Sequence, residues 1–278
     1  MKNPSKHLSF TIYLIGTILI FSLFLSCEET EEPVYQDREI YVWSHNDYEQ
    51  ERPLFQALEL GFQMIEADIH LIDGELRVIH DHPENPEEVP VLEEQYIRPL
   101  VEIIRQNNGV VLPESNVPFY LVIDVKTEAE SSFSELMNVL EPYRSYFTRL
   151  ENGEWIDGPI HLLISGNRPQ LDAGDADRMA FIDGRLPDIG RGLPTDLIPL
   201  ISDNWRNHFA WDGTGDITEE EFEKLQSYVR QTHEEGKIIR FWATPDKVAV
   251  WDVLIRAGVD VINVDDLEKM RNYLDGNL

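Results

Sequence analysis

The sequence is short of cysteine and of basic residues. Among 278 residues there is one cysteine, Cys27, and 23 lysines and arginines stand against 52 aspartates and glutamates, which gives a formal net charge of −29. Binding to the phosphate backbone of a nucleic acid needs a basic surface, and so does electrostatic binding to an anionic membrane. The composition therefore argues against a nucleic acid partner and against purely electrostatic attachment to a membrane.

Long apolar runs are also rare, and the one long run lies near the start of the chain. It spans residues 10–25, follows Lys2 and Lys6, and precedes Ser26 and Cys27. A basic start, an apolar stretch and then small residues are typical of a secretory signal, and a cysteine directly after such a stretch resembles the acylated first residue of bacterial lipoproteins. The alternative is an uncleaved membrane anchor, because the run is only slightly shorter than a bilayer span.

The sequence thus predicts an exported bacterial lipoprotein, anchored in a membrane through its lipid and facing the periplasm or the cell surface. We expect a signal peptide at residues 1–26, an acidic tether at 27–37 that begins with lipidated Cys27, and a single domain at 38–278. With Cys27 acylated, no thiol remains for a disulfide.

The rest of the chain has the composition of a folded α/β domain. Hydrophobic residues make up 42% of the chain and aromatic residues 10%, and one large domain fits this length. Strand-like runs alternate with helix-like segments over short connections, which indicates parallel strands. The predicted strands begin at Glu39, Phe62, Phe119, Ile160, Ala180, Leu197, Lys237 and Val259. Eight strands are the number of a TIM (β/α)8 barrel, which is therefore the predicted fold.

Carboxylates and histidines collect around the second predicted strand. Apolar and polar residues alternate along it, so Glu66 and Asp68 point to the same face. The pair Asp73-Gly74 predicts a tight hairpin turn, after which the chain returns and brings His80 toward the two carboxylates. His45 ends the preceding strand, so four groups of possible catalytic use are expected close together.

A fixed order of short motifs runs through the first half of the chain. The motifs are His45-Asn46, Glu66-x-Asp68, Asp73-Gly74, His80-Asp81 and Asp124-x-Lys126. This order resembles the glycerophosphodiester phosphodiesterase and phosphatidylinositol phospholipase C-like superfamily, and the start HNDY with the late stretches RFWATPD and INVDDL is most similar to its bacterial and fungal branch that begins with HND. The usual members have Arg after the first His, where this chain has Asn46.

Three carboxylates are the predicted metal ligands. Glu66, Asp68 and Asp124 lie at the ends of two predicted strands, and strand ends of a barrel meet at one mouth. Together they would form an all-oxygen site for one divalent cation, Mg²⁺ or Ca²⁺ rather than zinc. The alternative is that these carboxylates are helix caps or members of ion pairs, as is common in so acidic a chain.

His45 and His80 are the predicted catalytic pair. Cleavage of a phosphodiester needs one group to remove a proton from the nucleophile and another to protonate the leaving alkoxide, and an imidazole can do either. The alternative for any single histidine is a structural hydrogen bond, which is our expectation for His161, His208 and His233.

The residues predicted to bind the substrate or its phosphate are Asn46, Lys126, Arg240 and Trp242. The resemblance implies that Lys126 neutralises a phosphoryl oxygen, and the alternative is an ion pair with Glu66 or Asp124. Arg240 is the nearest replacement for the Arg that is missing after His45, and the alternative is a salt bridge in the barrel wall.

The sequence therefore predicts a metal-dependent phosphodiester hydrolase that acts on a small-molecule or lipid-derived phosphodiester. One alternative is a glycoside hydrolase, because barrels with paired carboxylates perform that chemistry, although it leaves His45, His80 and Lys126 without a role. The other is a non-catalytic ligand-binding lipoprotein, which the absence of the Arg after His45 favours.

Overall fold

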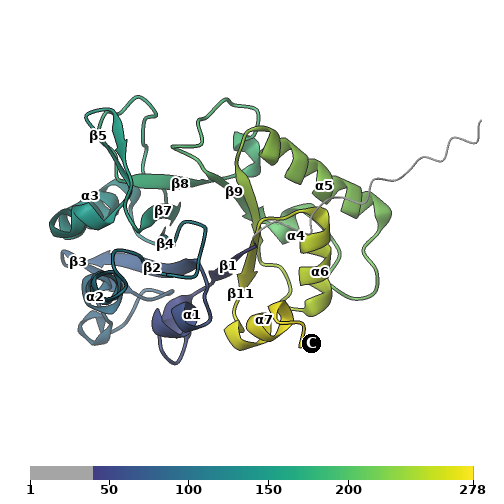
Figure 1. Ribbon diagram of the computed structural model, residues 1–278, viewed down its shortest axis with the longest axis horizontal. Helices are drawn as coiled ribbons and strands as arrows, with labels where there is room; N and C mark the ends of the chain where they lie inside the picture. Colours follow the sequence, from purple (N-terminus) through teal and green to yellow (C-terminus); the bar gives the residue numbers. More distant parts are fainter. Residues whose placement is uncertain (1–39, 278) are drawn as a thin grey trace, which may run out of the picture. The chain divides into compact units, whose positions relative to one another are not determined.

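The predicted apolar runs pair side by side as the parallel strands of a closed barrel (Figure 1). The structure is a computed structural model that describes residues 40–277. The barrel strands are β1 (Tyr41–Ser44), β2 (Met64–Ile72), β4 (Tyr120–Val125), β7 (His161–Gly166), β8 (Ala180–Gly184), β9 (Leu200–Asn204), β10 (Ile238–Trp242) and β11 (Val261–Val264). They follow one another around the barrel in this order, and β1 pairs with both β2 and β11, which closes it. All eight predicted strands are confirmed.

The hairpin after β2 follows from two residues, Asp73 and Gly74. Their φ angles are 51° and 82°, and positive φ at both central residues is what a two-residue type I′ turn requires. Strand β3 (Glu75–Val78) consequently runs antiparallel to β2, with Val78 opposite Ile69. The predicted hairpin is confirmed, and it carries the chain back to the carboxyl half of β2.

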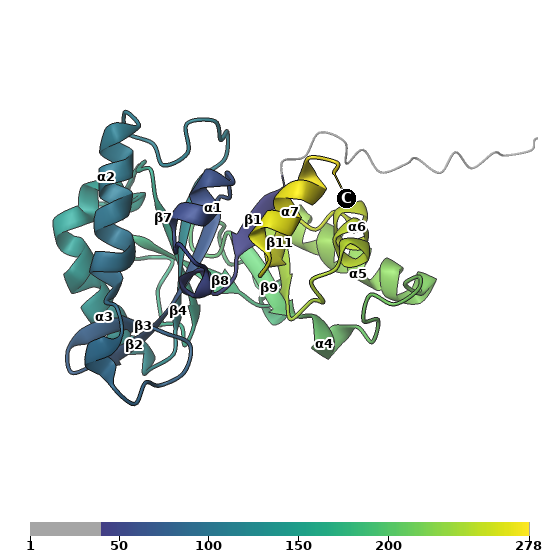
Figure 2. The ribbon, with the colours of Figure 1, turned by 90° about the horizontal axis from the view of Figure 1, so that it is seen from below.

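Helices cover the outside of the barrel, with α2 and α3 on one flank and α5, α6 and α7 on the other (Figures 1 and 2). The α-helices are α1 (Phe55–Glu59), α2 (Arg98–Gln106), α3 (Ala129–Leu140), α4 (Trp205–His208), α5 (Glu219–Glu234), α6 (Val248–Ala257) and α7 (Leu267–Leu274). A π-helical turn, Glu93–Ile97, leads into α2, and short 3-10 turns lie at Asp47–Glu49, Pro86–Glu88, Glu141–Tyr146 and Leu186–Asp188. The side chains of Thr218 and Asp266 cap α5 and α7 by accepting backbone N–H groups of their first turns.

The interior of the barrel changes from apolar to polar along the strands. Side chains of one strand face the interior at every second residue. The interior apolar cluster near the amino ends consists of Trp43, Met64, Tyr120, Val122, Leu163, Phe181, Leu200 and Val261. Two residues further along, the same faces carry the buried or half-buried polar residues Glu66, Asp124, Ser165, Asp183, Ser202 and Asn263. Polar groups therefore collect at the carboxyl ends of the strands, while the outward apolar side chains pack beneath the helices.

A second hairpin, which the sequence analysis did not predict, forms a separate two-stranded antiparallel sheet. It consists of β5 (Arg149–Glu151) and β6 (Glu154–Ile156). Asn152 and Gly153 form its turn, with φ angles of 52° and 79°. This is again the backbone geometry of a type I′ turn.

The predicted signal peptide, Cys27 and the acidic tether lie outside the described residues. Within residues 40–277, no helix has both the length and the apolar character that crossing a bilayer requires.

Candidate active site

A polar cavity of about 420 Å³ opens at the carboxyl ends of the barrel strands. Its lining residues are His45, Glu66, His80, Asp124, Val125, Lys126, Ser165, Gly166, Asn167, Arg185, Arg240 and Trp242. Seven of these twelve are residues that the sequence analysis assigned to a site. Because they come from strands far apart in the chain, the fold itself brings them together.

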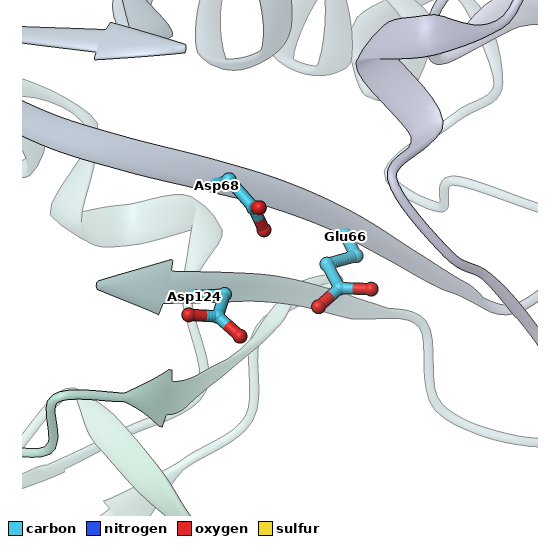
Figure 3. A group of neighbouring side chains, drawn as sticks. All are labelled: Glu66, Asp68 and Asp124. Carbon is cyan, nitrogen blue, oxygen red and sulfur yellow. The ribbon is translucent and has the colours of Figure 1, made fainter. Parts of the chain in front are cut away.

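Three carboxylates point toward one another at this end of the barrel (Figure 3). The ligand oxygen atoms of Glu66, Asp68 and Asp124 all lie within 4.8 Å of one another. Glu66 and Asp68 share a face of β2, and Asp124 is the register partner of Asp68 on β4. Burial and the charge of Glu66 raise the pKa of Asp68 to about 6, and burial, followed by the same charge, raises the pKa of Asp124. Such crowding of like charges needs a positive group to offset it.

The two oxygens of Asp68 differ in their partners. Oδ2 accepts hydrogen bonds from the hydroxyl of Tyr48 and from Nζ of Lys126, each at 2.9 Å. Oδ1 is buried and has no hydrogen-bond partner among residues 40–277. Lys126 also lies 3.2 Å from Oδ1 of Asp124. Two donors therefore fix the carboxylate of Asp68, and one buried oxygen remains for a further ligand.

Glu66 is held by neighbours from the first strand. Its Oε2 accepts a hydrogen bond from Nε1 of Trp43 at 2.8 Å and lies 3.4 Å from the backbone nitrogen of Asn46. Nε2 of His45 lies 4.0 Å from the same oxygen. The first predicted histidine and the first predicted metal ligand are thus direct neighbours.

His45 is paired with a carboxylate that the sequence analysis did not single out, Asp265. The distance between Nδ1 of His45 and Oδ1 of Asp265 is 2.7 Å. Burial lowers the pKa of His45, but the hydrogen bond to Asp265 and the charge of Glu66 outweigh it, so the pKa is raised. The same hydrogen bond lowers the pKa of Asp265. An ionised carboxylate can only accept, so Nδ1 carries a proton and Nε2 is free to accept one when His45 is neutral.

His80 reaches the cavity from the end of the β2–β3 hairpin. Its backbone carbonyl accepts a hydrogen bond from Nε2 of His70, at 3.0 Å, and its Nδ1 lies 3.2 Å from Oδ1 of Asp81. The side chain is 52% exposed, so it faces the open part of the cavity. His70, which matched no motif, therefore fixes the backbone of the predicted catalytic residue.

Arg240 lines the cavity, but its partner is an amide and not a carboxylate. Nε and Nη2 both donate to Oδ1 of Asn263, and the guanidinium lies 3.5 Å from the ring centre of Trp43. The side chain is buried between these groups. Trp242, on the same strand face, lies beneath another guanidinium, that of Arg185, at 4.8 Å.

Asn46 does not line the cavity. It has a left-handed backbone, with φ 47° and ψ 45°, a conformation that asparagine adopts more readily than most residues. The next residue, Asp47, is fully buried and accepts hydrogen bonds from Ser44, Tyr96 and the backbone of Leu54. The structure thus gives both residues a part in the shape of the loop after His45, and the phosphate contact of Asn46 remains a prediction.

Sequence reasoning missed several residues around the cavity: Tyr48, Ser165, Asp183, Arg185 and Asp265. One available signal was position, because Asp183, Arg185 and Asp265 lie at or just after strand ends, as the predicted ligands do. Tyr48 lies in the short 3-10 turn Asp47–Glu49 and meets Asp68 only in the folded chain, so no local pattern indicates it.

Three relatives of this chain come from fungi. The chain is 28% identical over 264 residues to an altered inheritance of mitochondria protein 6 homolog from Arthroderma benhamiae, covering 84% of this chain and 83% of that protein. It is 24% identical to altered inheritance of mitochondria protein 6 from Eremothecium gossypii (84% and 69%) and from Saccharomyces cerevisiae (81% and 68%).

These relatives overturn the predicted location. The sequence analysis expected an exported bacterial lipoprotein facing the periplasm or cell surface, and this prediction is wrong. The relatives are fungal proteins named for the inheritance of mitochondria, not bacterial lipoproteins. A periplasm is a bacterial compartment, so an apolar run before a cysteine was not sufficient evidence for that location.

The fold and the family agree with the motifs of the first half of the chain. A solved glycerophosphodiester phosphodiesterase from Parabacteroides distasonis has the same fold, with a TM-score of 0.53 at 14% identity over 86% of this chain and 98% of that one. Residues 239–268 match the glycerophosphoryl diester phosphodiesterase family. Residues 36–183, more than half of the chain, match the AIM6-like phosphodiesterase domain. The chain therefore belongs to the AIM6-like phosphodiesterase family, within the predicted glycerophosphodiester phosphodiesterase superfamily.

Proposed function

We propose that this protein is a metal-dependent phosphodiester hydrolase with two catalytic histidines. The observation that carries the proposal is that three clustered carboxylates, two histidines and one lysine meet at the mouth of one barrel. The family match supports the same reaction class.

Glu66, Asp68 and Asp124 would hold one divalent cation. The unpartnered buried Oδ1 of Asp68 fits this role, as do the carboxyl pKa values that burial and mutual repulsion raise. A site made only of oxygen atoms suits Mg²⁺ or Ca²⁺ better than zinc. When bound, such a cation supplies positive charge next to the phosphoryl oxygens and stabilises the charge that builds up in the transition state.

The two histidines would transfer protons on the two sides of the phosphorus atom. His45 carries its proton on Nδ1 toward Asp265, so Nε2 can take a proton from the nucleophile, a water or a hydroxyl of the substrate. His80, which is more exposed and follows β3, would protonate the leaving alkoxide. Lys126, fixed between Asp68 and Asp124, would donate a hydrogen bond to a phosphoryl oxygen.

The test compares substrate classes and metal states. Purified protein should hydrolyse bis(4-nitrophenyl) phosphate but no aryl glycoside, lose that activity with a chelator, and regain it with Mg²⁺ or Ca²⁺ more than with zinc. Asp68→Asn should abolish the activity, while Glu154→Gln, an exposed residue on β6, should leave it unchanged. Hydrolysis of aryl glycosides, or no hydrolysis of any phosphodiester, would overturn the proposal.

A further inference from the structure

Arg185 directly follows β8 and lines the cavity, and all hydrogen bonds of its side chain use one nitrogen atom. Nη1 donates to the backbone carbonyls of Asp183 (3.1 Å) and Gly184 (2.8 Å) and to Oγ of Ser202 (3.2 Å). The same atom lies 2.8 Å from Oδ2 of Asp183. No residue within 40–277 accepts a hydrogen bond from Nε or Nη2 of Arg185. The side chain is therefore anchored, and it still has donors to offer.

Asp183 leaves Nε and Nη2 of Arg185 without an acceptor, because both of its oxygens already accept hydrogen bonds from other groups. It is fully buried. Its Oδ2 accepts a hydrogen bond from Oγ of Ser165 at 2.7 Å, and its Oδ1 accepts one from Oγ of Ser202 at 2.5 Å. Nη1 of Arg185 is its third partner, so this fixed carboxylate holds the arginine side chain in place.

The wall around Arg185 has more positive than negative groups. Arg168 donates to the backbone carbonyl of Asp183 at 2.6 Å, and burial followed by the charge of Arg185 lowers the pKa of Arg168, because the two cations are near each other. The charge of Arg240 is also close enough to interact with Arg185 and Asp183. The carboxylates next to these three arginines are Asp183 and Asp188, which lies 3.9 Å from Arg168. In a chain with a net charge of −29, arginines outnumber carboxylates at this place.

This wall is separate from the three carboxylates. Asp124 lies on β4, which pairs with β7, and β7 pairs with β8, where Arg185 follows. Two strand spacings place the backbones of β4 and β8 about 10 Å apart, so Arg185 and the carboxylates rise from different parts of the cavity wall. The cavity of 420 Å³ has the volume of about fourteen water molecules, so it can hold a substrate that reaches from one wall to the other.

We propose that Arg185 and Trp242 form a second binding subsite, which takes an acidic group, a carboxylate or a phosphate, on the alcohol part of the phosphodiester substrate. The planar guanidinium offers Nε and Nη2 side by side, the arrangement that matches two oxygens of such a group. The ring centre of Trp242 lies 4.8 Å from the guanidinium carbon of Arg185, so the indole packs against the guanidinium and restricts its movement. This inference rests on the proposed phosphodiesterase function.

The experiment uses two pairs of substrates that differ by one acidic group. The pairs are glycerophosphoserine with glycerophosphoethanolamine, and glycerophosphoinositol 4-phosphate with glycerophosphoinositol. In at least one pair, kcat/KM should be about tenfold or more higher for the more acidic member, the factor expected for a hydrogen bond between charged groups. Arg185→Gln should remove this preference by lowering kcat/KM of the acidic member alone. Arg185→Lys keeps the charge but loses the two side-by-side N–H donors, so it should retain part of the preference. Arg98→Gln, an exposed arginine on α2, should change nothing.

Two phosphate monoesters with the same head groups give a readout that does not depend on turnover. Phosphoserine should bind more tightly than phosphoethanolamine in calorimetry, and Arg185→Gln should equalise them. Equal kcat/KM within both substrate pairs, or a preference that survives Arg185→Gln in folded protein, overturns the subsite. Failure to hydrolyse any of the four substrates counts instead against the proposed reaction, and in that case the titration of the two monoesters alone decides the subsite.

Discussion

At the scale of single residues, the pair of His45 and Asp265 makes the sharpest prediction. Asp265→Asn removes the ionised acceptor that raises the pKa of His45. The pKa of His45 should fall, so the acidic limb of the pH profile of kcat/KM should move to lower pH, and the rate at neutral pH should fall by at least about tenfold because the ring loses its orientation. Glu268→Gln, in the first turn of α7 nearby, is the matched control. An unchanged profile for Asp265→Asn would show that the pair has no part in proton transfer.

Tyr48 makes a second prediction at this scale. Its hydroxyl is one of two donors that fix Oδ2 of Asp68, and loss of such a partner of a metal ligand typically weakens metal binding by about 10- to 100-fold. Tyr48→Phe should therefore raise the dissociation constant of Mg²⁺ or Ca²⁺ in calorimetry. Tyr143→Phe removes a similar hydroxyl-to-carboxylate hydrogen bond, to Glu93, away from the cavity. Equal affinities in these two variants would contradict the role of Tyr48.

More of the site residues than of their hydrogen-bond partners could be predicted from the sequence. Glu66, Asp68 and His80 are linked by one strand and one hairpin, so strand periodicity and the Asp73-Gly74 turn were enough to bring them together. Asp265 follows the last strand, 220 residues after its partner His45. Only closure of the barrel brings these two together, and local patterns do not carry that information.

At the level of secondary-structure elements, alanine substitutions at two glycines distinguish the effect of backbone strain from the effect of a clash with the site. Gly166, at the end of β7, has φ 66°, and a Cβ there would collide with the Asp124 carboxylate and lie 2.6 Å from the carbonyl oxygen of Val125. Gly74 has φ 82° but open space around it. Gly74→Ala should lower the free energy of unfolding by about 1 kcal/mol with metal affinity intact. Gly166→Ala should cost more in urea unfolding and also weaken metal binding, and normal metal affinity in Gly166→Ala would count against the placement of Asp124.

His161, at the start of β7, predicts how stability depends on pH. Burial lowers its pKa to about 4, while the unfolded chain keeps the ordinary value near 6.5. Between pH 6.5 and 4 the unfolded state binds more protons than the folded state, so stability should fall as pH falls, by up to about 3 kcal/mol. The side chain stacks on Phe181, and His161→Phe should keep that contact.

His161→Phe should therefore lose less free energy of unfolding than the unchanged protein when pH falls from 6.5 to 4. His82→Gln, at an exposed histidine, should behave as the unchanged protein does. The measurement is urea unfolding across this pH range. The same loss of stability in His161→Phe would contradict the prediction.

The elements themselves were largely predictable because strands and helices alternate with clear periods. The β5–β6 hairpin was missed although Asn152-Gly153 is a strong turn signal. Its strands have three residues each, too few for the alternation of apolar residues to stand out. The π-helical turn before α2 could not be told from ordinary helix in the sequence, because its apolar spacing does not differ over so short a segment.

At the scale of the whole molecule, the acidic surface and the cavity have opposite characters. The chain has a net charge of −29, yet Lys126, Arg185 and Arg240 all line the cavity. A bound divalent cation would add to them and make the barrel mouth the place where an anionic phosphodiester is attracted. The proposed reaction therefore depends above all on the metal site.

The most direct test is a titration of Mg²⁺ or Ca²⁺ into metal-free protein, with bound metal and hydrolysis of bis(4-nitrophenyl) phosphate measured on the same samples. The rate should rise from zero in proportion to bound metal and reach its limit at one cation per chain, and Asp68→Asn should neither bind the cation tightly nor turn over. Full hydrolysis by metal-free protein, or a limiting rate that bears no relation to bound metal, would contradict the account.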